Sequence, residues 1–455
     1  MKSLVQIAAE VSGYDPQALP VAQAREFIAR LVPRVTAIEM LPLRSALGRV
    51  LGRDIVCAFN VPAHDNAAMD GYALRGSDLA ADAPARLALA GTGLAGQPFC
   101  GDVPAGYCVR ITTGAVMPAG LDTVVPQEFV RLDGNAVIVP PGAVRSGDNR
   151  RFAGEDLAAG EAALPAGRIL RPADLGMIAS LGVAEVPVLR RLRVAFFSTG
   201  DELRSIGEPL DAGCVYDSNR YTLWGMLQRL GVEVLDLGVV RDDPDALEAA
   251  FREAAACADA VITSGGVSVG EADHTKAIMA RLGEVLFWRI AMRPGRPMAI
   301  GRIGVRPDAE GRIGARPRAE ERIGTRADTD RGSASDGHTA ILFGLPGNPV
   351  AVMVTFYAFV RDALLAMSGA SVEPLPMLRA ASATAIRKKP GRTEFQRGIV
   401  SRASDGGWQV SVAAAQGSGI LRSMSTANGL VVLGDAQGNV AAGESVDVLP
   451  FDGLI

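Results

Sequence analysis

The second half of the chain alternates apolar runs with amphipathic helical patterns, and this alternation constrains the fold more than any other feature. The apolar runs LRVAFF, VEVLDLGVV, DAVIT and TAILFG are interleaved with helical patterns over residues 220–230, 244–256, 274–282 and 349–367. Such alternation is typical of βαβ units on a mostly parallel sheet covered by helices on both faces. The pattern therefore predicts a three-layer αβα domain whose ligands bind beyond the carboxyl ends of the strands.

The remaining segments have other patterns of apolar, glycine and proline residues. Residues 21–31 place apolar side chains on one helical face, and Ser45 is positioned to cap a second short helix through Leu51. From about residue 60 to 153, short apolar runs separated by Gly, Pro and Asp-Gly predict a β-rich module, and a short helix follows with Pro172 in its first turn and Gly182 just past its end. The short strands after residue 373 predict a small β-barrel.

A length of 455 residues favours several domains. We predict a multidomain α/β protein made of four parts. They are a helical hinge region (1–58 and 154–190, domain I), an inserted β-rich domain (59–153, domain II), the αβα domain (191–372, domain III) and a C-terminal β-barrel domain (373–455, domain IV). Three tandem decapeptides occupy residues 301–330, and their Gly, Pro and mixed charges predict a disordered insertion over 303–337.

Composition excludes several classes of protein. Lys and Arg total 46 against 50 Asp and Glu, a net charge of -4, so no general attraction to nucleic acid or to anionic lipid is expected. No apolar run approaches the roughly 18 residues of a membrane helix. Five cysteines without a C-x-x-C spacing indicate buried, reduced thiols, and we expect a cytoplasmic protein with neither nucleic-acid nor membrane partners.

Two glycine motifs resemble known sites but lack the required context. Residues 91–96 match G-x-G-x-x-G, yet Pro98 follows where a dinucleotide site needs a helix, so a tight turn is predicted. Residues 266–270 match the G-x-S-x-G nucleophile motif around Ser268. The chain has only three histidines, and none is suitably placed as the base of a catalytic triad, which argues against a hydrolase.

Three predicted strand-to-helix loops are rich in glycine and in oxygen ligands. Glycines allow the backbone to approach an anion, and helix amino termini favour phosphate. Carboxylates at the same strand ends suit Mg²⁺, although each Asp alone is also a good helix cap. The substrate-binding candidates are Thr199, Gly200, Ser264, Gly265, Gly266, Ser268, Pro346, Gly347, Asn348 and Pro349, and the metal candidates are Glu202, Asp242 and Asp273.

A second group of candidates is cationic. Arg289, Arg293 and Arg296 lie in FWRIAMRPGRP, where two prolines would present the guanidinium groups from a stiff loop. Guanidinium forks suit oxyanions, but a solvated charged strand end is the alternative. In the β-rich module, Asp70, Thr113 and the Glu155–Asp156 pair lie in predicted turns and, taken alone, indicate only turn chemistry.

Taken together, nine segments resemble the MoeA/gephyrin family of molybdopterin molybdenumtransferases in order and spacing. The segments are VPAHDNAAMDGYAL, RITTGA, RRFAGEDLAAG, FSTGDEL, VYDSNR, LGVVRDDP, ITSGGVSVGEAD, FWRIAMRPGRP and FGLPGNPV. The resemblance implies a homodimer of four-domain subunits that inserts molybdate into adenylylated molybdopterin with Mg²⁺-dependent release of AMP. It also implies a cleft shared between subunits, with the Asp70 and Thr113 loops facing the α/β domain of the other subunit.

The resemblance also assigns roles to individual residues. Active-site positions of the family are matched by Asp70, Thr113, Glu155, Asp156, Glu202, Asp242, Asp273, Pro346 and Pro349, and positions associated with molybdate by Arg293, Arg296, Arg392 and Ser418. Many relatives carry lysines where this chain has Arg289, Arg293 and Arg296, and this difference bears on molybdate affinity. The molybdopterin adenylyltransferase and molybdoenzyme maturation factors are candidate partners.

Two other functions stay open from the sequence. An adenylyltransferase acting one step earlier on molybdopterin would share the Gly-Gly loop, and it predicts ATP turnover without molybdate. A gephyrin-like scaffold would use the αβα domain and the carboxy-terminal region to bind peptides, but this chain lacks the long linker and fused domain that such a role suggests.

Overall fold

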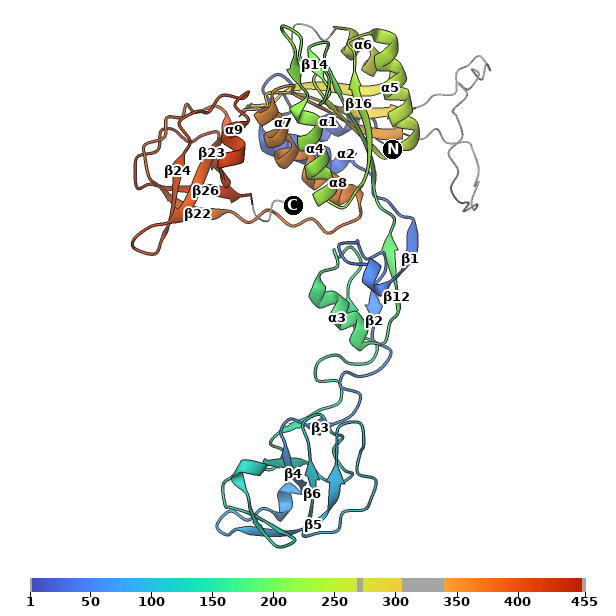
Figure 1. Cartoon of the computed structure of the whole chain (residues 1–455), viewed down its shortest axis with the longest axis vertical. Coiled ribbons are helices and arrows are strands. Elements are labelled where there is room, and N and C mark those ends of the chain that lie inside the picture. Colours follow the sequence, from blue (N-terminus) through green and yellow to red (C-terminus); the bar gives the residue numbers. More distant parts are fainter. Residues whose placement is uncertain (1, 268–272, 305–338, 452–455) are drawn as a thin grey trace, which may run out of the picture. The chain divides into compact units, whose positions relative to one another are not determined.

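The computed structural model describes residues 2–267, 273–304 and 339–451. These residues belong to two compact units, unit 1 with Met1–Glu39 and Leu189–Ile455, and unit 2 with Met40–Val188 (Figure 1). The predicted disordered insertion over 303–337 lies outside the described residues except for its first two positions, which end a strand. The four predicted domain boundaries stay predictions.

Unit 1 is built on a six-stranded sheet with the order β16-β13-β17-β21-β20-β18. The strands are β13 (Arg193–Thr199), β16 (Glu233–Val240), β17 (Ala260–Ser264), β18 (Gly283–Arg289), β20 (Pro297–Gly304) and β21 (Thr339–Leu345). The first four strands in this order are mutually parallel, as predicted, whereas β20 pairs antiparallel with both β21 and β18. The sequence did not reveal β20 as a strand, because its first residue is a proline and it runs into the decapeptide segment.

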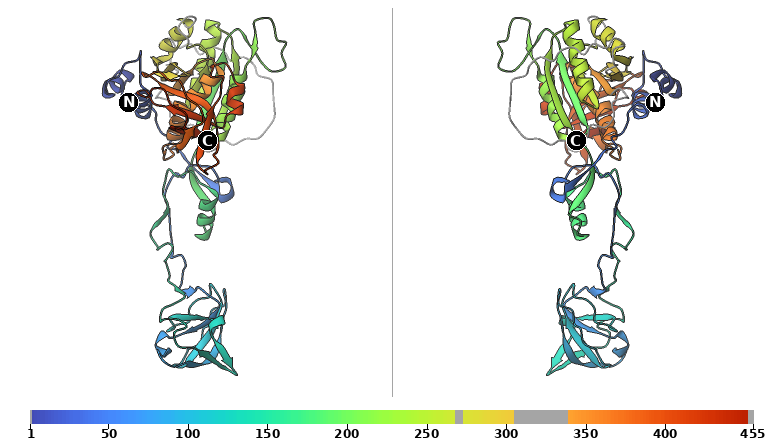
Figure 2. Two further views of the ribbon diagram at one scale, coloured as in Figure 1. Left: turned by 90° about the vertical axis from the view of Figure 1, so that its left-hand side faces the viewer. Right: turned by 90° about the vertical axis from the view of Figure 1, so that its right-hand side faces the viewer.

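Helices cover both faces of this sheet and confirm the predicted three-layer αβα arrangement (Figures 1 and 2). One face packs against α5 (Pro244–Cys257) and α6 (Asp273–Leu282), and the other against α2 (Val21–Leu31), α4 (Ser218–Arg229) and the helix that begins at Pro349. The five apolar residues predicted for the buried face of α2 are all buried. Asp243 accepts a hydrogen bond from the Ala246 amide and so caps α5.

The helix from Pro349 to Met367 runs through the hydrophobic core. It consists of α7 (Pro349–Thr355), a π-helical turn (Phe356–Val360) and α8 (Arg361–Met367). Arg25 of α2 donates a hydrogen bond of 2.9 Å to the Ala358 carbonyl within the π-helical turn. The expectation that no segment reaches the length of a membrane helix is wrong, because this helix is long and apolar enough to cross a membrane by length and composition. However, 72% of its apolar window is buried inside the protein, which is the behaviour of a core helix.

The carboxy-terminal part of unit 1 is the predicted β-barrel. Its strands are β22 (Leu378–Ser382), β23 (Thr393–Arg402), β24 (Trp408–Val412), β25 (Gly429–Leu433) and β26 (Ser445–Pro450), with the short helix α9 (Arg422–Thr426) between β24 and β25. The pairing order β23-β24-β22-β26-β25 closes because β25 also pairs with β23. A further short strand, β19 (Met292–Arg293), pairs with β23 and joins the arginine-rich segment to the barrel.

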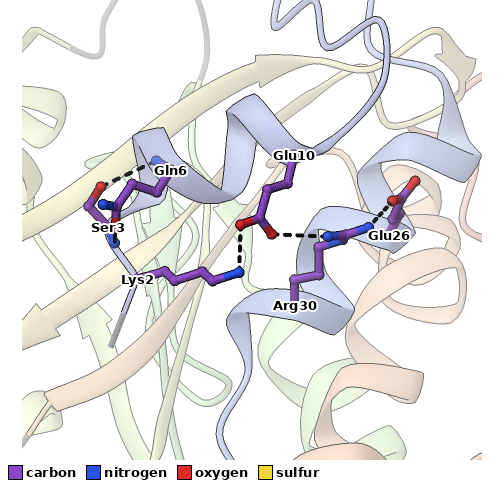
Figure 3. A network of polar contacts seen from close by, with 6 residues as sticks. All are labelled: Lys2, Ser3, Gln6, Glu10, Glu26 and Arg30. Atoms are coloured by element: carbon purple, nitrogen blue, oxygen red, sulfur yellow. Dashed lines mark hydrogen bonds and ion pairs between the residues drawn. The ribbon is translucent and has the colours of Figure 1, made fainter.

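A chain of ion pairs lies along the amino-terminal segment of unit 1 (Figure 3). Helix α1 (Leu4–Glu10) begins with a capping box at Ser3 and Gln6, and Glu10 contacts both Lys2 and Arg30. Arg30 also contacts Glu26. These side chains are largely exposed, so the ion pairs contribute little individually, and burial of the apolar face of α1 in the large core fixes the segment.

Unit 2 contains a separate six-stranded sheet with the order β7-β4-β6-β5-β9-β8. Its strands are β4 (Gly71–Leu74), β5 (Ala85–Gly93), β6 (Tyr107–Ile111), β7 (Thr123–Pro126), β8 (Arg131–Asp133) and β9 (Ala136–Val139). Shorter pairs join β1 (Ile38–Pro42) to β12 (Glu185–Leu189), β2 (Ile55–Val56) to β11 (Ala162–Leu164), and β3 (Asn66–Ala67) to β10 (Arg150–Arg151). Helix α3 (Pro172–Ser180) agrees with the prediction.

Two local predictions for unit 2 have opposite outcomes. The helix expected from Ser45 through Leu51 is wrong, because Ser45 ends a single 3₁₀ turn (Leu43–Ser45) and Gly48 then adopts a positive φ of 72°, which turns the chain. The tight turn expected at residues 91–96 is confirmed, because Leu94 and Gln97 form a bridge around Gly96. All five cysteines are free thiols, although Cys100 and Cys257 are exposed and not buried.

Candidate functional site

A cavity of about 590 Å³ lies at the carboxyl ends of the parallel strands of unit 1. Its wall includes the loops that follow β13, β17 and β21, as expected for a ligand site of an open α/β sheet. Most of the predicted residues of unit 1 line this one cavity, namely Thr199, Gly200, Glu202, Asp242, Ser264, Gly265, Gly266, Arg293, Pro346, Gly347, Asn348 and Ser418. Pro349 begins α7 directly beside them.

The glycine loops are close-packed in a way that only glycine permits. Gly265 has a φ of 99°, and a Cβ built there would lie 2.5 Å from the carbonyl oxygen of Thr199. The amide of Gly265 donates to the Leu345 carbonyl at 3.1 Å, which joins the loop after β17 to the loop after β21. Both loops therefore present a narrow, backbone-lined surface to the cavity, which suits an anionic group.

Two carboxylates form an acidic wall of the cavity. The Asp242 carboxylate accepts a hydrogen bond of 2.5 Å from the hydroxyl of Thr199, and the Asp242 amide donates to Asp201. The Glu202 carboxylate lies over Gly200, within 3 Å of the position a Cβ would take. The Glu202 carbonyl accepts a hydrogen bond from the Val215 amide, but its carboxylate has no hydrogen-bond or ion-pair partner among the described residues and is available to a ligand.

The third predicted metal ligand is less well defined. Asp273 is the first residue of α6, but its side chain lies outside the described part of the chain, as does Ser268. Across residues 2–267, 275–304 and 339–451, no group of three or more acidic, His or Cys side chains is close enough to hold a metal ion. Two carboxylates on one wall nevertheless fit Mg²⁺, because this ion usually takes one or two carboxylates and completes its shell with water and substrate phosphate.

Another part of the cavity lining is cationic and polar. Arg293 ends the short strand β19 and reaches the cavity together with Gly295 and Pro297. Ser418 reaches it from the barrel, and its carbonyl accepts a hydrogen bond from the Val350 amide at 3.0 Å, so the barrel loop is attached to the start of α7. The cavity thus has an acidic wall and a basic wall.

The structure separates the other predicted arginines from this cavity. Arg296 and Arg392 line a smaller cavity of about 220 Å³, together with Arg289. The Arg392 guanidinium is also engaged by the buried Glu394 carboxylate, at 2.8 and 2.9 Å. The four residues predicted for molybdate therefore divide into Arg293 and Ser418 in the large cavity, and Arg296 and Arg392 in the small one.

Two residues that support the large cavity were not assigned a role from the sequence. Arg397 of β23 is 1% exposed, and it donates to Ser423 and to the carbonyls of Ala415 and Gly417, next to Ser418. Its pKa is lowered, first by burial and second by the charge of Arg293. Asn219 of α4 lines the cavity itself. Asn219 lies in VYDSNR, one of the nine segments that carried the family resemblance, whereas Arg397 lies outside them.

Asp70 and Thr113 contact each other in unit 2. The Thr113 amide and hydroxyl donate to the same Asp70 carboxylate oxygen, at 2.7 and 2.8 Å. These two bonds, the backbone one first, hold the pKa of Asp70 below its ordinary value, with a smaller contribution from Arg110. The structure therefore brings this predicted pair together and keeps the carboxylate ionised.

Glu155 and Asp156 lie elsewhere in unit 2. They line a cavity of about 530 Å³ with Asn66 and Arg151, and neither Asp70 nor Thr113 contributes to that cavity. Glu155 accepts a hydrogen bond from the Phe152 amide, and the Asp156 amide donates to Val61. Glu155 thus makes the local bond from side chain to backbone that is expected of an acidic residue in a turn.

Family models match almost the whole chain. The model of the MoeA N-terminal region (domains I and II) matches residues 19–182, that of a probable molybdopterin binding domain matches 195–366, and that of the MoeA C-terminal region (domain IV) matches 379–451. The MoeA protein of Pyrococcus horikoshii OT3 has a similar crystal structure, with a TM-score of 0.74 at 27% identity, over 95% of this chain and 99% of that one.

Sequence relatives agree with the family models. A molybdopterin molybdenumtransferase of Haemophilus influenzae is 39% identical over 438 residues, which is 96% of this chain and 100% of the relative. Molybdopterin molybdenumtransferase 2 of Mycobacterium tuberculosis is 34% identical over 90% of this chain and 94% of the relative. Gephyrin of Dictyostelium discoideum is 31% identical over 94% of this chain, but over only 62% of its own length. The chain therefore belongs to the MoeA family of molybdopterin molybdenumtransferases.

Proposed function

We propose that this protein inserts molybdate into adenylylated molybdopterin, releasing AMP and forming molybdenum cofactor. The observation that carries the proposal is the single cavity with an acidic wall at Glu202 and Asp242 and a basic wall at Arg293. Adenylylated molybdopterin carries phosphates and must also receive an oxyanion. Its binding site therefore requires both kinds of wall in one cavity. The relatives from Haemophilus influenzae and Mycobacterium tuberculosis, which match 96% and 90% of this chain, are named molybdopterin molybdenumtransferases.

The acidic wall is the proposed place for Mg²⁺. Glu202 and Asp242 would hold the ion, together with Asp273 by the family resemblance, and the bound ion would neutralise charge on the pyrophosphate bridge. The hydroxyl of Thr199 holds the Asp242 carboxylate in one orientation through its hydrogen bond. Because this hydroxyl is used by Asp242, we assign Thr199 to positioning and not to direct contact with the substrate.

The glycine loops are the proposed place for the substrate phosphates. Backbone amides around Gly265, Gly266 and Gly347 can donate to phosphate oxygens without a side chain in the way. This arrangement resembles other phosphate sites in which the protein supplies position and charge but no covalent nucleophile.

The basic wall is the proposed place for molybdate as substrate. Arg293 offers a planar fork to a tetrahedral oxyanion, and Ser418 adds a hydroxyl donor. Arg397 acts one layer behind by holding the carbonyls of residues 415 and 417, so that Ser418 stays at the cavity edge. Arg296 and Arg392 line the neighbouring small cavity and would act there on an arriving or departing oxyanion.

We also propose a homodimer, in which the family resemblance gives Asp70, Thr113, Glu155 and Asp156 their role at the partner's cleft. An exposed apolar surface of unit 1 supports an interface. It consists of Ile206, Leu210, Val215, Tyr216, Tyr221 and Trp224, on α4 and on the arm that contains β14 (Leu203–Arg204) and β15 (Val215–Tyr216). Large apolar side chains that stay exposed on neighbouring segments are often used for association.

The same proposal places the reaction in the cytoplasm. Five free thiols are typical of a reducing compartment, and the one helix of membrane-spanning composition in the described chain is largely buried.

The test is incubation with adenylylated molybdopterin, Mg²⁺ and molybdate, with AMP and active cofactor measured together. The proposal predicts that both products appear, and that omission of molybdate or of Mg²⁺ abolishes cofactor formation. Turnover of ATP on molybdopterin without molybdate would favour an adenylyltransferase. Absence of AMP release under all conditions, together with capture of peptide partners, would favour a scaffold.

A further inference from the structure

One amide side chain at the start of α4 contacts both the end of β17 and the loop after β21 at the wall of the large cavity. Asn219 is the second residue of α4 and is 8% exposed, so its carboxamide is inside the protein. Its Nδ2 donates to the hydroxyl of Ser264, at the end of β17, at 2.8 Å. The same nitrogen donates to the carbonyl of Gly347, in the loop after β21, at 2.6 Å.

The orientation of this amide is determined by its partners. The oxygen of Gly347 is a carbonyl and can only accept, so the nitrogen of Asn219, and not its oxygen, must face it. The second amide hydrogen then goes to Ser264. The oxygen of Asn219 is buried and has no partner among the described residues, so the two donated bonds account for the polar contacts that fix this side chain.

These two bonds change what Ser264 and Gly347 offer to a ligand. Ser264 receives its hydrogen bond from Asn219, so its own proton is free to be donated into the cavity that it lines. The Gly347 carbonyl oxygen accepts a hydrogen bond from Asn219, which partly neutralises its negative partial charge. Without this bond the carbonyl oxygen would repel an anion in the cavity. Both effects favour a negatively charged group in the cavity.

The fold does not depend on this amide for joining the loops. The amide of Gly265 already donates to Leu345 across the same two loops, and the neighbouring strands β17 and β21 are paired in register up to Ser264 and Leu345. The side chain of Asn219 therefore adjusts the surface of the cavity on top of a backbone that is already held.

We propose that Asn219 is a positioning residue for the phosphate-bearing part of the substrate, acting through Ser264 and Gly347. The inference rests on the proposed function, because it names the residue that sets the phosphate-binding geometry of the same cavity. The basic wall, with Arg293, does not contact this amide, so the role is confined to the phosphate side of the substrate.

The experiment compares the affinities of purified full-length variants for two probes, ADP with Mg²⁺ and molybdate alone, by calorimetry. Asn219→Ala is expected to weaken ADP binding about tenfold and to leave molybdate binding within twofold. Asn219→Asp keeps the size of the side chain but cannot donate to Gly347 and adds a negative charge, so it should weaken ADP binding further than Asn219→Ala does. The double variant with Ser264→Ala should lose less than the sum of the two single losses, because Asn219 acts partly through Ser264.

Asn428→Ala is the matched control. The Asn428 carboxamide likewise makes two hydrogen bonds, accepting from the Val400 amide and donating to the Val400 carbonyl in the barrel, and it does not line the cavity. It should leave ADP binding unchanged, and the unfolding temperature of both alanine variants is measured to separate folding from binding. Equal ADP affinity for the natural protein, Asn219→Ala and Asn219→Asp would overturn the inference. Failure of the natural protein to bind ADP at all would instead contradict the proposed function.

Discussion

Replacing Arg397 with methionine removes the support beneath the loop that carries Ser418. The guanidinium makes three hydrogen bonds, of 3.0, 3.1 and 3.0 Å, to Ser423, Ala415 and Gly417, and none of these acceptors is a carboxylate. Methionine fills a similar volume but donates nothing, so two buried carbonyls lose their partner at a cost of about 1–3 kcal/mol each. Removing a buried, unpaired charge offsets part of this cost.

We expect a net loss of about 3 kcal/mol in the stability of unit 1, which lowers its unfolding temperature by roughly 5 °C or more. Hydrogen exchange should accelerate at amides 413–418 while the central sheet stays protected. The KM for molybdate should rise more than the KM for the adenylylated substrate, because only the basic wall is disturbed. Arg397→Lys, which keeps the charge but cannot reach all three acceptors, should lie between the natural protein and the methionine variant.

The reasoning predicts a linked outcome for these measurements. A methionine variant with unchanged exchange at 413–418 and an unchanged KM for molybdate would show that Arg397 does not hold the Ser418 loop. Uniformly faster exchange throughout unit 1 would show a general loss of packing and would equally refute a local role.

Three further predictions concern other parts of the molecule. Asp242→Asn should fold normally but lose Mg²⁺-dependent AMP release by about 10²-fold or more, and near-normal turnover would exclude Asp242 from the metal site. Thr113→Val removes one of two donors to Asp70, so the pKa of Asp70 should rise toward its ordinary value in a carboxyl ¹³C titration. Because the pKa of Asp70 is lowered in the folded state, the stability from this contact is present at neutral pH and is lost as the pH falls through that lowered pKa. An unchanged Asp70 titration would show that the hydroxyl is not a significant donor. Trp224→Glu should convert the proposed dimer to a monomer, as measured by light scattering, with Leu132→Glu in unit 2 as the control, and a dimer that survives Trp224→Glu would place the interface elsewhere.

The sequence predicted the parts of the fold that depend on local pattern. The apolar face of α2 and the start of α3 at Pro172 follow from spacing and from the chemistry of one or two residues. The parts that depend on tertiary pairing were not predictable in this way. Strand β20 begins with a proline, and it is a strand because it pairs with β21 and β18 on either side.

The candidate site shows the same division. Loops that follow parallel strands must meet at one edge of the sheet, so the convergence of Gly200, Gly265 and Gly347 could be predicted. The separation of Arg293 from Arg296 could not be predicted. The backbone conformation of the turn decides which cavity each side chain lines, and the sequence pattern does not give that conformation. Asn219 gave no signal in isolation, since its importance lies in two contacts with residues distant in sequence.

The central claim is that the carboxylates and a guanidinium of unit 1 act on one substrate assembly in one cavity. Anomalous diffraction at the molybdenum edge, from crystals grown with ADP, Mg²⁺ and molybdate, tests it directly. The account predicts a molybdenum peak beside Arg293 and Ser418, in the same cavity as the nucleotide phosphates at the glycine loops. Molybdenum found only outside that cavity, with the nucleotide bound at the glycine loops, would contradict it.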